Sequence, residues 1–152
     1  MKFEKIVFLM ITISICTVLI TTQLQTQDSI SVLVNNSGPY IGTAIPHDYG
    51  FDGSGIIISV IDTGVDFNHP DLLGLGLDGK IIGGYDFIDN DETPQDSNGH
   101  GTQVAGIIAA NGDLTGIAPN SKILAYRVSE DGESVSSNLI IKAIEKSISD
   151  NA

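Results

Sequence analysis

The sequence has little cysteine and little positive charge. It contains one cysteine, no tryptophan, and 7 lysine and arginine residues against 19 aspartate and glutamate residues. Because Cys16 lies in an apolar segment near the N-terminus, we expect packing or bound ions, and not a disulfide, to stabilise the folded region. The net charge of −12 repels phosphate backbones, so the composition argues against a nucleic-acid partner.

Only one long hydrophobic run is present, and it lies near the N-terminus. Two lysines precede Ile6–Ile20, which is apolar apart from two threonines and one serine. A basic start and a short apolar core are typical of a secretory signal, and a membrane-spanning helix needs about 20 apolar residues. Residues 21–23 offer no clear cleavage site, so two interpretations stay open. Either residues 1–27 are a signal peptide and the protein is secreted, or residues 6–20 anchor it in a membrane.

After a polar extension at residues 28–50, the apolar pattern alternates between that of strands and that of helices. The expected strands are Ile56–Ile61, Ile81–Phe87 and Lys122–Val128. One expected helix starts at Gly101 with Val104, Ile107 and Ile108 on its apolar face, and another spans Ser136–Asn151 with Ile140, Ile144 and Ile148 on its face. This alternation predicts an α/β fold with a mainly parallel sheet and flanking helices. The continuous apolar run of the first strand predicts burial on both of its faces.

Two polar residues stand where these elements meet loops. Asp62 follows the first expected strand, and His100 lies between Gly99 and Gly101 at the start of a helix. In open parallel sheets, functional groups gather beyond the carboxyl ends of the strands. A carboxylate there can accept the N–H of an imidazole, which leaves the other ring nitrogen free to take a proton. Asp62 and His100 are therefore the candidate catalytic pair.

The motifs around this pair resemble those of the subtilisin family of serine proteases. The resemblance rests on Asp62-Thr63-Gly64-Val65-Asp66-x-x-His69-Pro70-Asp71-Leu72, on Asn98-Gly99-His100-Gly101-Thr102-x-Val104-Ala105-Gly106, and on Gly116-Ile117-Ala118-Pro119-x-Ser121. It implies a three-layer α/β/α peptidase domain over residues 51–152 that acts as a serine endopeptidase on peptides or proteins. In that domain Asp62 would orient the base and His100 would be the general base.

The resemblance also implies a nucleophilic serine in a Gly-Thr-Ser-Met-Ala segment and an oxyanion-hole asparagine, and the sequence contains no such segment. Ser97 lies in a turn near His100, and we do not expect it to be the nucleophile. The last helical pattern reaches Ala152 with no glycine or proline to stop it. We therefore expect a truncated domain with negligible peptidase activity by itself.

Two positions depart from the family pattern. Gln103 stands where the family usually has a second histidine, and it keeps a polar side chain there. Asp71 matches a calcium-ligating position of members whose following turn carries an insertion that wraps the ion. Residues 110–116 form a shorter turn, which argues against calcium binding and leaves Asp71 as the one candidate metal ligand. The resemblance implies no required cofactor.

The substrate-binding region and the functional class each leave an alternative. Gly132, Glu133 and Ser134 lie roughly where the family lines its peptide cleft, although a plain surface loop explains them equally well. The main interpretation is a truncated serine endopeptidase whose partners are peptides or proteins. The alternative is a non-catalytic secreted module that binds peptides, or an inactive gene fragment.

Overall fold

The computed structural model describes residues 38, 41–76 and 79–152. The predicted signal peptide or anchor at residues 1–27 lies outside the described residues, as does most of the extension that follows it. Among the described helices, none combines the length and the apolar character needed to cross a membrane.

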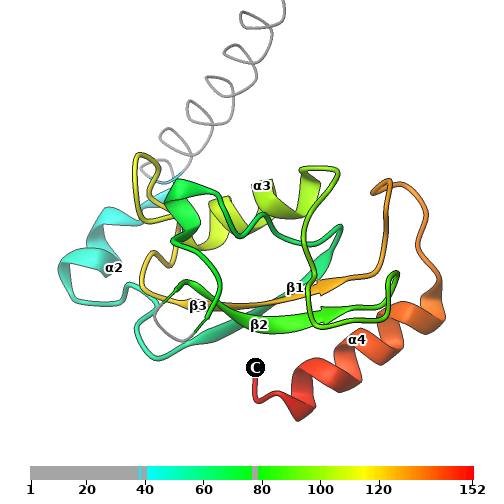
Figure 1. Ribbon diagram of the computed structural model, residues 1–152. Helices are drawn as coiled ribbons and strands as arrows, with labels where there is room; N and C mark the ends of the chain where they lie inside the picture. The colour runs from blue at the N-terminus through cyan, green and yellow to red at the C-terminus, as the bar shows by residue number, and fades with distance from the viewer. Residues whose placement is uncertain (1–37, 39–40, 77–78) are drawn as a thin grey trace, which may run out of the picture. The chain divides into compact units, whose positions relative to one another are not determined.

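Three parallel strands form the sheet, with β3 between the other two (Figure 1). The strands are β1 (Ile57–Asp62), β2 (Ile81–Asp86) and β3 (Lys122–Arg127). Each lies within one residue of its predicted position. Helix α3 (His100–Ala109) covers one face of the sheet and helix α4 (Ser137–Ser149) covers the other (Figure 1). This arrangement confirms the predicted α/β class with a parallel sheet and flanking helices.

Two short elements were not predicted. Helix α2 (Ala44–Asp48) lies within the segment expected to be a polar extension, and it buries none of its residues. The 3-10 helix η1 (Pro70–Leu72) begins at a proline, where a missing N–H costs nothing, and the Nδ1 of His69 accepts the N–H of Asp71 at 3.2 Å. Both elements are too short to show a helical period in the sequence.

The core has two halves, one on each side of β3. Ile123 and Ala125 point toward α3, where they meet Ala105 and Ala109. Leu124, Tyr126 and Val128 point toward α4 and pack with Ala143. The alternation follows from the two-residue period of a strand, and β3 is buried on both faces because a helix covers each.

The prediction that the first strand is buried on both faces was wrong. In β1 only Val60 is fully buried, and the other five residues are partly exposed. The physical reason is position, because β1 pairs with β3 along one edge and with no other strand among the described residues. The strand with full burial is β3, whose sequence has the same apolar character.

The predicted apolar faces of both helices also need correction. In α3 the buried residues are Gly101, Ala105 and Ala109, while Ile107 remains 45% exposed. In α4 the buried residue is Ala143, while Ile144 and Ile148 are exposed. Val104 and Ile108 are partly buried and pack against the core, so two of the three predicted residues of the α3 face are confirmed. In both helices the fully buried positions carry small side chains, which let the helix backbone approach the sheet closely.

The burial of Ile123 in the central strand and the exposure of Ile107 on α3 can be tested with a pair of isoleucine-to-alanine variants. We expect Ile123→Ala to lower the free energy of unfolding by roughly 2–5 kcal/mol, because it opens a cavity in the centre of the sheet. Ile107→Ala should change it by less than about 0.5 kcal/mol, because the side chain is largely in water. Urea unfolding monitored by circular dichroism measures both free energies. If Ile107→Ala lost as much stability as Ile123→Ala, Ile107 would have to be buried, which would contradict the exposed position assigned to it on α3.

Candidate active site

The site is built where β1 ends and α3 begins. Asp62 is the last residue of β1, and His100 is the first residue of α3. The Nδ1 atom of His100 lies 2.8 Å from Oδ1 of Asp62. Because a carboxylate can only accept, Nδ1 carries the proton of this hydrogen bond. The Nε2 atom is then left free, and the His100 side chain is 59% exposed while that of Asp62 is 17% exposed.

The contact between His100 and Asp62 is possible because the backbone at the start of α3 lies close to the backbone at the end of β1. A Cβ atom at Gly101 would collide with the carbonyl oxygen of Gly64 and would crowd the side chain of Asp62 at 3.2 Å. Gly64 has a φ of +101°, and a Cβ there would lie 2.7 Å from the carbonyl oxygen of Pro94. Both glycines therefore allow the first turn of α3 to lie directly against the end of β1.

A carboxylate that sequence reasoning did not single out lies behind the pair. Asp96 accepts hydrogen bonds at 2.9 Å from the Thr63 hydroxyl and from the backbone N–H groups of Asn98, Gly99 and Thr102, and at 2.5 Å from the Thr102 hydroxyl. Burial alone would raise the pKa of Asp96, but these hydrogen bonds outweigh it and hold the pKa below its ordinary value. An aspartate just before a helix start is a sequence signal for such capping.

The electrostatics of the site favour the protonated imidazole. The hydrogen bond from His100 to Asp62 and the charge of Asp62 raise the pKa of His100 above 6.5. The small desolvation of the ring opposes this shift, and the charge of Asp96 adds to it. Asp62, which accepts the hydrogen bond of the imidazole, therefore also makes it more basic.

A buried ion pair lies under the turn that precedes His100. Arg127, at the end of β3, lies beside Asp62 in the sheet register and is 2.8 Å from Asp86 and 2.7 Å from Asp89. Its Nη2 atom also reaches the hydroxyl of Ser97 at 3.5 Å. The hydrogen bond that Arg127 donates to Asp86 is the main reason that the pKa of Arg127 is raised above its ordinary value. This one cation balances one of the two negative charges, and it ties the end of β3 to the end of β2 and to the turn that precedes His100.

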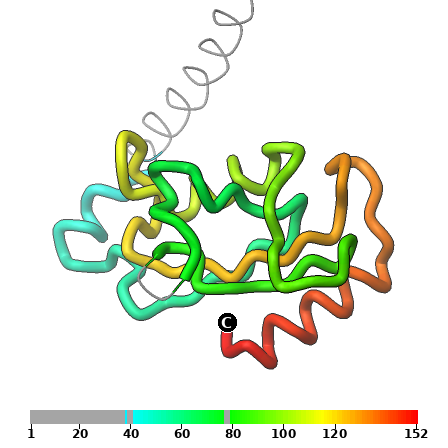
Figure 2. Tube along the Cα trace, viewed as in Figure 1, coloured from blue at the N-terminus to red at the C-terminus, as the bar shows by residue number. Residues whose placement is uncertain are grey.

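A hollow opens beside the imidazole. It has a volume of about 220 Å³ and is lined mainly by apolar side chains and by the catalytic candidates: Ile61, Asp62, Thr63, His100, Val128, Ser129, Gly132, Val135 and Ile140. The loop after β3 forms one wall. Figure 2 traces this loop in orange from the end of β3 toward α4. The Asn98 side-chain amide ties the loop to the segment before α3 by donating to the Asp131 carbonyl at 3.0 Å.

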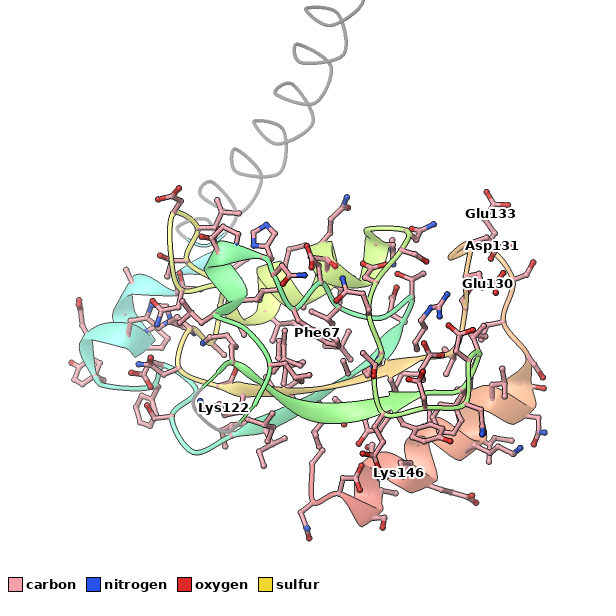
Figure 3. The ribbon with its side chains drawn as sticks, in the orientation of Figure 1. Phe67, Lys122, Glu130, Asp131, Glu133 and Lys146 are labelled. Atoms are coloured by element: carbon pink, nitrogen blue, oxygen red, sulfur yellow. The ribbon has the colours of Figure 1, made fainter. Side chains whose placement is uncertain are left out.

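The structure separates the three residues predicted for the substrate cleft. Gly132 lines the hollow, and a Cβ built on it would lie 3.9 Å from Cβ of His100. Glu133 and Ser134 are exposed and are not part of its lining. Figure 3 shows Glu133 at the tip of this loop with Glu130 and Asp131, pointing outward.

Asp71, the candidate metal ligand, is occupied by backbone amides. Its carboxylate accepts the N–H of Asp113 at 2.8 Å and that of Leu114 at 3.3 Å. A Cβ at Gly112 would collide with the same carboxylate. Across residues 41–76 and 79–152, no group of three or more acidic, histidine or cysteine side chains is arranged to hold a metal ion. The contacts of Asp71 are those of a residue that anchors the turn after α3.

The described residues bring together the acid and the base but not a nucleophile. Within this part of the chain, no serine hydroxyl is hydrogen-bonded to the imidazole of His100. Ser97 faces Arg127 instead. Gln103 is exposed on α3 and takes no part in the site.

Comparison with known proteins gives a consistent result. Residues 53–152 match the family model described as the subtilase family, Peptidase_S8. The chain is 41% identical over 138 residues to the minor extracellular protease Vpr of Bacillus subtilis, covering 83% of this chain and 16% of that protein. It is 51% identical over 87 residues to Thermitase of Thermoactinomyces vulgaris, covering 55% of this chain and 29% of that protein. The chain thus spans less than a third of either relative.

A solved structure is similar as well. The crystal structure of a cold adapted subtilisin-like serine proteinase superposes with a TM-score of 0.56 and 40% sequence identity. The match covers 66% of this chain and 34% of that one.

The Asp62–His100 contact predicts a specific titration. We expect His100 in the full chain to titrate above pH 6.5 and Asp62→Asn to bring its pKa down, because the amide removes the charge. Since the folded-state pKa is raised, the contact stabilises the fold below the unfolded pKa, and this stabilisation is lost as pH rises through the folded value. NMR titration of the His100 ring measures the shift. A value at or below 6.5 would rule out the contact.

The space around two glycines predicts opposite effects on stability when each is replaced by alanine: Gly112 lies against the Asp71 carboxylate, and Gly106 faces open space. Gly112→Ala should lower the free energy of unfolding by about 1–3 kcal/mol, because the new methyl group meets the Asp71 carboxylate. Gly106→Ala, at a helical position with open space, should raise it by about 0.5–1 kcal/mol. The urea midpoints of the two variants should therefore move in opposite directions.

Proposed function

The chain belongs to the subtilase family, and on this basis we propose that it carries the acid and the base of a serine endopeptidase. The observation that supports this most directly is the 2.8 Å contact between Nδ1 of His100 and the carboxylate of Asp62. It fixes the ring tautomer in which Nε2 can accept a proton. The roles proposed are orientation of the base for Asp62 and general base, then general acid, for His100.

The proton path follows from this geometry. Nε2 of His100 takes the proton of a serine hydroxyl as its oxygen bonds to the carbonyl carbon of a peptide, and the imidazolium then gives that proton to the leaving amine as the C–N bond breaks. Water repeats the two steps in reverse to release the acyl group. The carboxylate of Asp62 stays ionised throughout and stabilises the imidazolium. The serine would come from protein outside the described residues.

The surroundings of the pair suggest the substrate. The hollow is lined by His100 and by the apolar side chains of Ile61, Val128, Val135 and Ile140, so a side chain of an extended peptide could fill it. We propose Gly132 as a wall of this cleft, with Glu133 and Ser134 at its outer rim. Partners are then peptides or proteins, and the acidic surface again disfavours nucleic acids.

The proposed chemistry needs no catalytic cofactor, because the protons move between side chains and substrate. Asp71 already binds two backbone amides, which favours an anchoring role over calcium ligation. For location we propose export, because a relative is named as an extracellular protease and the N-terminal run has the pattern of a secretory signal.

A graft can test the proposed activity. The 87 residues that match Thermitase would replace the corresponding segment of that protein, so that Asp62 and His100 work with a serine supplied by the host. We expect the graft to hydrolyse casein, and His100→Ala to lower kcat by at least about a thousandfold. Ser97→Ala, in the same turn, is the matched control and should keep the activity. A folded graft that is inactive, or that is indifferent to His100→Ala, would overturn the proposal.

The chain by itself provides a complementary test that separates the endopeptidase from other interpretations. A fluorophosphonate probe reacts with an activated serine hydroxyl, and we expect it to leave the full chain unlabelled. Stoichiometric labelling would show that one of the serines present is activated by His100. In that case the assignment of a missing nucleophile would be wrong.

A further inference from the structure

Asp96 lies four residues before His100, in the loop between β2 and α3. Its two carboxylate oxygens divide five hydrogen bonds between them. Oδ1 accepts from the Thr63 hydroxyl and from the N–H groups of Asn98 and Gly99, while Oδ2 accepts from the N–H and the hydroxyl of Thr102. The donors come from the end of β1, from the loop and from the first turn of α3.

On the side of Asp62, the link runs through Thr63. The Thr63 N–H donates to Oδ1 of Asp62 at 2.7 Å, and its hydroxyl donates to Asp96 at 2.9 Å. The same hydroxyl oxygen accepts the N–H of Gly101 at 2.9 Å. The Thr63 hydroxyl therefore links Asp96 to Gly101, the residue after His100, and Thr63 itself directly follows Asp62.

On the side of His100, the link runs through the backbone. Gly99 immediately precedes the histidine, and its N–H is held by Oδ1 of Asp96. Thr102, two residues after the histidine, donates twice to Oδ2, and its hydroxyl oxygen accepts the N–H of Asp66 at 2.9 Å. The backbone that carries the imidazole is thus bound on both sides by one carboxylate.

We propose that Asp96 is a positioning residue for His100, and that its carboxylate, through Thr63, sets how the first turn of α3 lies against the end of β1 so that the imidazole meets Asp62. This role rests on the proposed function for its catalytic meaning. Asp96 does not touch the imidazole in any hydrogen bond of the described residues. It acts through the segments that carry the acid and the base.

If Asp96 only capped α3, its replacement would have a different effect on His100 than if it positions the imidazole, so the two roles can be told apart. A residue that only capped α3 would affect the stability of the helix and leave the tautomer of His100 unchanged. A positioning residue also controls the Nδ1–H to Asp62 hydrogen bond. The readout is therefore the tautomer of the His100 ring, through its ¹⁵N shifts, which report the protonated nitrogen. The pKa of His100 does not separate the two roles, because loss of the Asp96 charge lowers it in either case.

The test uses the full ¹⁵N-labelled chain, in a mild detergent that keeps the apolar N-terminal run in solution. In Asp96→Asn we expect the Nδ1–H tautomer to lose population to the Nε2–H form and the pKa of His100 to fall toward that of a free histidine. The matched control is Asp52→Asn, because Asp52 also accepts bonds from Ser54 and Asn120 but lies before β1. It should leave the His100 signals unchanged.

Two results would overturn the proposal. One is a folded Asp96→Asn variant whose His100 tautomer is unchanged, whatever its pKa. The other is an equal change in Asp52→Asn, which would show a general loss of structure.

A second pair of variants keeps the proposal testable if Asp96→Asn does not fold. Thr63→Val removes the bridging hydroxyl while it keeps the size and shape of the side chain. We expect it to shift the His100 tautomer in the same direction, and Thr63→Ser, which retains the hydroxyl, to restore the wild-type signals. Wild-type signals in a folded Thr63→Val variant would contradict the proposed link.

The outcome is independent of the proteolysis assay. If the Thermitase graft is inactive while the His100 tautomer depends on Asp96, the proposed function fails and the positioning role stands. If the graft is active while the tautomer ignores Asp96, the reverse holds.

Discussion

The hydrogen bond between His100 and Asp62 is the constraint on which the rest of the site depends. It requires the end of a strand and the start of a helix, far apart in the sequence, to meet within the reach of two short side chains. The parallel sheet provides the strand end, and α3 reaches it because Gly101 leaves no side chain in the way. Ala105 and Ala109 continue the same close approach along the helix. The small residues of α3 therefore serve the site as well as the core.

Sequence reasoning identified the elements and the reactive pair for clear physical reasons. Continuous β-branched runs marked the strands, and the residues around Asp62 and His100 carry a distinctive pattern. It could not identify β3 as the central strand, because the order of strands depends on contacts between distant segments. It placed the helix faces correctly at Val104 and Ile108, which pack against the core, but it also took Ile107 and Ile148 as buried, and both are exposed. The donors to Asp96 were missed for a similar reason, since they are brought together only by the fold.

The charges around His100 create a conflict between orientation and reactivity. Asp62 fixes the tautomer that a general base needs, yet the same charge favours the imidazolium, which cannot accept a proton. The charge of Asp96 acts in the same direction as that of Asp62, and only the small desolvation of the ring opposes them. Asp96 keeps its own charge because five donors stabilise it. The net result is an imidazole whose pKa is raised.

The geometry of the acid and base is complete within the segment from Asp62 to Thr102. Each hydrogen bond that holds the pair, from Thr63, from Asp96 and from the first turn of α3, has both partners inside that segment. No contact with a nucleophile is needed to orient the ring. An imidazole oriented in advance loses little freedom when a hydroxyl arrives, which is the condition for efficient proton transfer. The Asp62–His100 pair is therefore oriented without a contact to a serine, although β3 must be in place, because β1 pairs with it and α3 packs on it.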